Sequence, residues 1–209
     1  MPSLPNAASK RPLLICDVDE VVLHFIQPFE AWLGARGLRF LSHRYKLAGN
    51  IAGADGTTLD QSRVGPLLQD FFDASVERQI PVDGAAEALA RLSALADIVF
   101  LTNLPGTWNE AARGRTLARA GMDYPLVTNS GPKGTAAARL AAGRRAPVVF
   151  VDDSPLNLRS VAASLAGCTL IQFIADARFL ASAEDIDGVG LKTDDWNLAE
   201  AYISQVVGG

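Results

Sequence analysis

The stretch Leu13-Leu14-Ile15-Cys16-Asp17-Val18-Asp19 decides the fold of this chain. Four apolar residues lead without a break into two carboxylates that stand two positions apart. A continuous apolar run is typical of a strand that is buried on both faces of a parallel sheet. Residues i and i+2 of an extended chain point the same way, so Asp17 and Asp19 can face one site. Taken alone, the pair has an equal alternative as turn or helix-capping aspartates.

The chain repeats this pattern of a buried run that ends in polar residues. The runs are Pro12–Cys16 before Asp17, Asp97–Leu101 before Thr102, Pro147–Val151 before Asp152 and Thr169–Ile174 before Asp176, with a shorter one at Tyr124–Thr128. Helical patterns lie between them, at Ala85–Leu95, Thr107–Ala120, Gly134–Ala142 and Leu156–Leu165. This alternation predicts an α/β fold with a doubly wound, mostly parallel sheet, and it gathers the polar residues at the carboxyl ends of the strands.

About sixty residues interrupt the alternation before the turn Pro81-Val82-Asp83-Gly84. The interruption is typical of a helix at Pro28–Arg36, a hairpin at Leu38–Leu47 and Asn50–Leu59, and a second helix at Gln61–Gln79. We therefore expect a core domain made of residues 1–23 and 81–209, and a small inserted cap, residues 24–80, that covers the strand ends and contacts the substrate. A last helix is expected at Asp194–Val207.

Composition and charge exclude several classes of function. Hydrophobic residues make up 49% of the chain and charged residues 20%, which fits a folded globular protein. The net charge of -4 and the pI of about 5.2 argue against a long nucleic acid as partner, because a phosphate backbone needs a basic surface. No apolar run is long enough to span a membrane and residues 1–12 lack the core of a signal peptide, so we expect no membrane and a cytoplasmic location.

The few cysteines and histidines argue against a disulfide, a histidine-rich metal site and a Ser-His-Asp triad. Cys16 and Cys168 lie in or beside buried runs, which favours free thiols over a disulfide. His24 and His43 are the only histidines, so a histidine-rich metal site or a Ser-His-Asp triad has little material. We interpret both histidines as structural or surface residues.

A second acidic pair, Asp152-Asp153, follows the run that ends at Val151. Magnesium prefers few carboxylates together with waters and phosphate oxygens, so Asp17 and one member of this pair would suffice as protein ligands. Helix capping before Pro155 is the alternative, because proline suits the first turn of a helix. Two acidic pairs at two strand ends favour the metal site.

Three more polar residues could serve a phosphate group. Thr102 and Asn103 follow the second run, where a hydroxyl and free backbone N–H groups can bind phosphate oxygens. Lys133 stands at a predicted helix start, although the helix dipole favours lysine at the opposite end. A role that faces the site explains this exception, and a solvated surface lysine is an equal alternative.

In this order, the residues resemble the four motifs of the haloacid dehalogenase superfamily: Asp17-x-Asp19-x-Val21, a run that ends in Thr102, Lys133, and a run that ends in Asp152-Asp153. The resemblance extends from Leu13 to about Asn157, and Pro81–Leu92 is similar to the segment that re-enters the core after an inserted cap. It implies a Rossmann-like core, Mg²⁺ as cofactor, and a phosphatase that acts on a small phosphorylated metabolite. The dehalogenases of the family lack the second acid, so Asp19 favours phosphate chemistry.

The resemblance also implies a role for each residue of the site. Asp17 would attack phosphorus and form an aspartyl-phosphate. Asp19 would protonate the leaving oxygen and then take a proton from the hydrolytic water. Thr102 and Asn103 would bind phosphate oxygens, and Lys133 would offset the charge on Asp17 and on the transferring group.

The same resemblance implies a metal site made by Asp17, the backbone carbonyl of Asp19, and Asp153 with Asp152 beside it. Of the last two, Asp153 is the favoured ligand. Asn157 resembles an accessory polar residue that orients a motif side chain.

Other residues are interpreted as structural or left open. Glu20 and Val21 stand where Gly and Thr are frequent in the family, and we interpret Glu20 as the start of a flap that leads into the cap. We expect packing from Trp32, Phe71 and Phe72, and helix capping from Asp194 and Asp195. For Arg44, Tyr45 and Lys46, contact with an anionic substrate and a solvated edge strand remain equal interpretations.

Rival functions differ in the order of their motifs. A signalling receiver domain places its acidic pair first and its phosphorylated aspartate in a middle strand, and it has no insertion of this size. A P-loop hydrolase would need a longer glycine-rich loop than Gly131-Pro132-Lys133-Gly134. A phosphomutase of the same fold, and a catalytically silent binding protein that keeps the fold, remain alternatives to the phosphatase.

Overall fold

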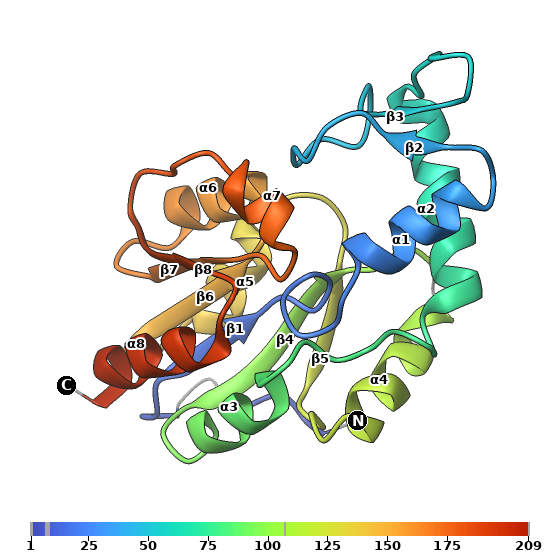
Figure 1. Ribbon diagram of the computed structural model, residues 1–209. Helices are drawn as coiled ribbons and strands as arrows, with labels where there is room; N and C mark the ends of the chain where they lie inside the picture. The colour runs from blue at the N-terminus through green and yellow to red at the C-terminus, as the bar shows by residue number, and fades with distance from the viewer. Residues whose placement is uncertain (1, 7–8, 107, 209) are drawn as a thin grey trace.

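The computed structural model describes residues 2–6, 9–106 and 108–208. Its core is a six-stranded parallel sheet with the strand order β5-β4-β1-β6-β7-β8 (Figure 1). The strands are β1 (Leu13–Cys16), β4 (Asp97–Asn103), β5 (Leu126–Asn129), β6 (Val148–Asp152), β7 (Thr169–Phe173) and β8 (Val189–Thr193). The predicted α/β fold with a doubly wound parallel sheet is confirmed, and β1 lies between the two strands whose ends carry the other motifs.

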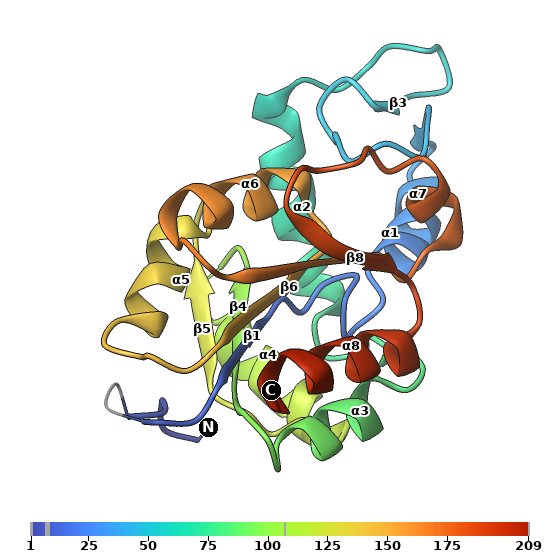
Figure 2. The ribbon, with the colours of Figure 1, turned by 90° about the vertical axis from the view of Figure 1, so that its left-hand side faces the viewer.

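Helices cover both faces of the sheet (Figure 2). They are α3 (Ala85–Leu92), α4 (Asn109–Arg119), α5 (Gly134–Ala141), α6 (Pro155–Ser164), α7 (Ala177–Ala181) and α8 (Trp196–Gly208). The period of two in β1 sends Leu14 and Cys16 to a cluster with α3 and α8, and Leu13 and Ile15 to a cluster with α5 and α6. Burial on both faces explains why β1 is continuously apolar.

The elements from Ile26 to Ser75, which fall within the predicted insertion, form a lobe beside the carboxyl ends of the strands (Figure 1). It contains α1 (Ile26–Gly34), the antiparallel pair β2 (Arg39–Phe40) and β3 (Ile51–Ala52), and α2 (Gln61–Ser75). Phe71 is central to its packing, because the rings of Phe25, Phe29, Trp32 and Phe72 all lie within 5.9 Å of its ring centroid. The helix, hairpin and helix that the sequence predicts are all present.

Some elements differ from the prediction. Strand β8 and helix α7 were not predicted, because β8 alternates between half-buried and exposed residues at the sheet edge and α7 has only five residues. The helix predicted from residue 107 is observed from Asn109, and residue 107 itself lies outside the described residues. The second helix of the insertion is predicted to end at Gln79 but is observed to end at Ser75, so Gln79 lies outside it.

Two further expectations can be compared with the structure. Cys16 and Cys168 are both free, as the sequence predicts. Over the part of the chain that the structure describes, no helix combines the length and the apolar character that crossing a membrane requires.

Gly134 allows α5 to approach α6 closely, which suggests a stability test. A Cβ at this position would lie 2.3 Å from the backbone oxygen of Ser160 and 2.4 Å from Oγ of Ser164. We expect Gly134→Ala to lower the free energy of unfolding by about 1–3 kcal/mol, because the backbone of α6 must shift. Urea unfolding measures this effect. Gly34→Ala is the control, since a Cβ there meets nothing within 4 Å, and a variant at 134 as stable as this control would contradict the packing argument.

Candidate active site

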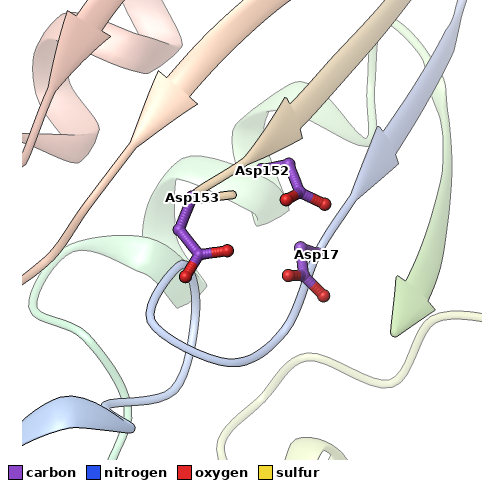
Figure 3. Close-up of side chains that lie close together, drawn as sticks. All are labelled: Asp17, Asp152 and Asp153. Atoms are coloured by element: carbon purple, nitrogen blue, oxygen red, sulfur yellow. The ribbon is translucent and has the colours of Figure 1, made fainter. Parts of the chain in front are cut away.

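Three carboxylates meet where β1 and β6 end (Figure 3). Asp17 follows β1, Asp152 is the last residue of β6, and Asp153 follows it. One oxygen from each lies within 4.8 Å of one from each of the others. The parallel pairing of β1 with β6 aligns Cys16 with Val151, so the residues that follow emerge side by side. We call these three carboxylates the acidic cluster.

Burial makes the cluster electrostatically strained. Loss of hydration raises the pKa of Asp17 to about 7, although Lys133 opposes the rise, and the charges of Asp152 and Asp19 add to it. Burial, followed by the charges of Asp152 and Asp17, also raises the pKa of Asp153 well above its usual value. Three carboxylates share one buried ammonium, so the cluster lacks positive charge. This donor set fits a small divalent cation.

Lys133 supplies the one ammonium of the cluster. It is fully buried at the start of α5, with Nζ 2.6 Å from Oδ1 of Asp17 and 2.8 Å from Oδ2 of Asp152. Although burial acts in the opposite direction, these two carboxylates raise the pKa of Lys133, which keeps it charged. The unusual position of a lysine at a helix start is thus explained by its contacts with the cluster.

The two neighbouring aspartates are held differently. Asp152 accepts hydrogen bonds from Lys133, from the backbone N–H of Ser154 at 2.9 Å, and from Nδ2 of Asn157 at 3.0 Å. In the described part of the chain, the Tyr45 hydroxyl is the group that faces the Asp153 carboxylate, and it stabilises the charged form of that carboxylate without a hydrogen bond of normal geometry. Asp152 therefore orients Lys133, while Asp153 keeps its oxygens for another ligand. Asn157 orients a motif side chain, as the resemblance implies.

Asp17 also has one oxygen committed and one free. Oδ1 accepts from the backbone N–H of Val18 at 2.7 Å and lies 2.6 Å from Nζ of Lys133. Among the residues that the structure describes, no group donates a hydrogen bond to Oδ2. The side chain is therefore fixed in orientation with one oxygen available.

Thr102 and Asn103 end β4, next to β1. Thr102 is fully buried, and its Oγ1 makes a long contact of 3.5 Å with Oδ2 of Asp19. The side chain of Asn103 donates to the carbonyl of Gly131 at 2.9 Å and accepts from Nδ2 of Asn129 at 2.8 Å. Asn103 thus fastens β4 to the loop that leads to Lys133, which leaves its backbone N–H as the group that could bind phosphate.

Asp19 does not join the acidic cluster, because another set of donors holds its carboxylate. Arg113 of α4 donates to both of its oxygens, at 2.9 and 3.0 Å. Gln79 donates to Oδ1 at 2.8 Å and accepts from Arg113 at 2.9 Å. Both partners are buried, and we call this the Asp19 clamp. The carboxylate of Asp19 thus lies outside the group of three carboxylates, although its charge still acts on Asp17.

Arg113 and Gln79 were not among the site residues predicted from the sequence. A signal existed for Arg113, because it occupies the buried stripe of α4 together with Asn109, Thr116 and Leu117. Three polar residues on the buried side of a helix need hydrogen-bond partners, and the guanidinium of Arg113 also needs a countercharge. Gln79 gave no such signal, because it lies just beyond the helix of the insertion.

Glu20 has a larger structural role than expected. It adopts a left-handed backbone with φ 63° and is buried. Oε2 accepts the first backbone N–H groups of α1, from Phe25 at 3.0 Å and Ile26 at 2.7 Å, and Oε1 accepts that of Asp176 at 2.7 Å. Burial raises its pKa, while these amides oppose the rise. One carboxylate therefore connects the turn after β1, the insertion and the segment before α7.

The residues that the sequence indicates as structural, or whose role it leaves open, fall into two groups. Phe71 and Phe72 are buried in the insertion, and Asp195 caps α8 by accepting from Asn197 at 2.8 Å. Tyr45 lies beside the acidic cluster, where burial and the charge of Asp153 raise its pKa. Its hydroxyl is buried yet forms no hydrogen bond of normal geometry with any described residue.

Comparison with known proteins places the fold. The sequence matches no protein-family model and no curated protein. A phosphonoacetaldehyde hydrolase-like protein from Oleispira antarctica is 16% identical with a TM-score of 0.65, over 100% of this chain and 96% of that one. A HAD family hydrolase from Deinococcus radiodurans, with bound phosphate and sodium, is 16% identical with a TM-score of 0.60, over 96% and 97%. A HAD-hydrolase from Bacillus subtilis bound to magnesium is 12% identical with a TM-score of 0.59, over 93% and 99%. The chain therefore has the fold of the haloacid dehalogenase-like hydrolases, as its motifs predict.

Proposed function

We propose that this protein is a magnesium-dependent phosphatase that hydrolyses a small phosphate monoester through an aspartyl-phosphate on Asp17. The observation that carries the proposal is the environment of Asp17, whose Oδ1 is held by Lys133 and Val18 while Oδ2 stays free. A buried carboxylate fixed in this way can attack phosphorus without first losing a shell of water. The ammonium of Lys133 offsets the charge that gathers there during transfer.

Asp17 and Asp153 are the side chains that would hold Mg²⁺, with the backbone carbonyl of Asp19. Asp152 is the less suitable ligand, because Lys133 and Asn157 already bind its carboxylate. When bound, Mg²⁺ would withdraw charge from the phosphoryl oxygens and relieve the repulsion within the acidic cluster.

The remaining residues orient the phosphoryl group and move protons. The hydroxyl of Thr102 and the backbone N–H of Asn103 bind phosphoryl oxygens at the end of β4. Asp19 exchanges a proton with the leaving oxygen and with the hydrolytic water. Because Arg113, Gln79 and Thr102 contact its carboxylate, Asp19 must give up one of these contacts to do so. The insertion covers the site as a cap and excludes water.

Removal of the metal tests the proposal. We expect the purified protein to release phosphate from a generic aryl phosphate in Mg²⁺, to lose this activity in EDTA, and to regain it when Mg²⁺ is restored. Mg²⁺ should also raise the midpoint of thermal unfolding of the wild type, because it binds only the folded chain. Asp153→Asn should need far more Mg²⁺ for both effects, whereas Asp187→Asn, at an exposed position, should behave as the wild type.

Two outcomes would oppose the proposal. Activity that survives EDTA would contradict the metal requirement. Failure to hydrolyse any member of a broad panel of phosphate esters would instead favour a silent protein that keeps the fold.

A further inference from the structure

A cavity of about 250 Å³ reaches the acidic cluster at Asp153 and separates the insertion from the core. Its wall is mainly apolar and aromatic, with Phe25 and Phe40 from the insertion and Phe179 from the core. The rings of Phe40 and Tyr45 each meet that of Phe179 edge to face, at centroid distances of 5.6 and 5.7 Å. Such a wall suits a planar apolar group better than a flexible polyol.

A wider hollow of about 540 Å³ lies next to this cavity. Arg44, Tyr45 and Ser154 line both spaces, so the two are neighbours, and we call them together the groove beside Asp153. A phosphate ester bound at Asp17 could therefore extend its leaving group along this groove.

Cations without partners line the groove. Arg44 and Lys46 are exposed, and among the described residues neither forms an ion pair, whereas Arg159 in the wider hollow is paired with Glu184 at 3.0 Å. Lys133 lines neither space and is committed to Asp17 and Asp152, so it does not serve as the partner of a second anion there. A second anion on the substrate would give Arg44 and Lys46 the partner they lack.

The loop that carries the two cations is held in shape by a buried amide. Asn50 accepts from the backbone N–H of Ser42 at 2.9 Å and donates to the carbonyls of Ser42 and Arg44 at 2.8 and 3.3 Å. The backbone of the loop is therefore held in place before an anion binds, which lowers the entropy lost on binding.

We propose that the substrate is a phosphate monoester whose leaving group carries a planar apolar ring and a second anionic group. The ring lies in the 250 Å³ cavity against Phe40 and Phe179, and Arg44 with Lys46 binds the second anion. This inference rests on the proposed phosphatase function and adds the chemical class of its substrate.

Four matched phosphate esters test the class: benzyl phosphate, 4-carboxybenzyl phosphate, propyl phosphate and 4-phosphooxybutanoate. All are esters of primary alcohols, so they differ in the ring and in the second anion rather than in the nature of the leaving oxygen. We expect 4-carboxybenzyl phosphate to have the highest kcat/KM. Each of the two features should contribute about tenfold or more, as expected for burial of a ring and for a charge-assisted hydrogen bond.

Variants assign each feature to its residues. The double variant Arg44→Gln/Lys46→Gln should lower kcat/KM about tenfold or more for the two esters that carry a carboxylate. It should change kcat/KM little for the two esters without one. Phe40→Leu should lower it for the two aromatic esters only. Arg63→Gln, which removes one exposed charge from α2 of the insertion, is the control and should change none of the four.

Two results would overturn the proposed substrate class. Equal kcat/KM for all four esters would overturn the substrate class. An equal loss for all four in the double variant would show that Arg44 and Lys46 bind the transferring phosphate instead, and would also overturn it. Titration calorimetry with Asp17→Asn separates this proposal from the phosphatase function. If the variant prefers 4-carboxybenzyl phosphate but the wild type does not hydrolyse it, the substrate class is supported and the phosphatase function is refuted.

Discussion

Asp17→Asn is expected to lower phosphatase activity about 1,000-fold or more, because an amide oxygen cannot form the aspartyl-phosphate. Mass spectrometry of rapidly quenched wild-type protein should detect one added phosphoryl group, and the variant should show none. The fold should survive the change. Burial raises the pKa of Asp17 to about 7, so the folded state disfavours its charged form, and above that pH a neutral residue costs no stability.

Thermal unfolding at pH 8 provides the control for this variant. In EDTA, we expect a midpoint equal to or above that of the wild type, because one charge leaves a repulsive cluster. Turnover that persists in a well-folded Asp17→Asn protein would rule out Asp17 as the nucleophile.

Arg113→Met is expected to have the largest effect on stability, about 3 kcal/mol or more in the free energy of unfolding. The guanidinium is fully buried, while the side chain of Asp19 is 15% exposed. Removing Arg113 leaves that carboxylate poorly solvated and without its bidentate partner, and leaves Oε1 of Gln79 without a donor. Urea unfolding with an unchanged slope would report a loss of stability without a change in the unfolded state.

A double-mutant cycle tests whether the loss comes from the ion pair. Asp19→Asn combined with Arg113→Met should lose clearly less than the sum of the two single losses, because neither charge is then left alone. Arg113→Lys should recover only part of the stability, since an ammonium cannot reproduce the two parallel hydrogen bonds. Strict additivity would contradict the coupling.

The fold was predictable because its deciding residues act locally and in register. Continuous burial of β1 made its sequence uniformly apolar, and parallel pairing then brought Asp17 to Asp152 and Asp153. The helix dipole made the position of Lys133 unusual but left a solvated surface lysine as an equal interpretation, and only the order of the motifs favoured the site. Edge strand β8 escaped prediction, since half-exposed residues carry little apolar signal.

The Asp19 clamp could not be predicted, because its members come from three unconnected segments. Gln79 and Arg113 are 60 and 94 residues from Asp19. No local pattern relates a glutamine beyond one helix to an arginine within another. The role of Glu20 was hidden too, because its contacts depend on a left-handed backbone that the sequence would assign to glycine.

Glu20 and Gln79 also limit how this architecture could be recombined. Both connections of the insertion are fastened to the core by side-chain contacts: Glu20 binds the amides that begin α1, and Gln79 binds Asp19 and the carbonyl of His24. A chimaera that exchanged residues 24–80 as a unit would separate Glu20 from the native start of α1 and Gln79 from Asp19. Modules grafted between proteins of this fold should therefore be joined inside residues 27–78, so that both fastenings stay with the recipient.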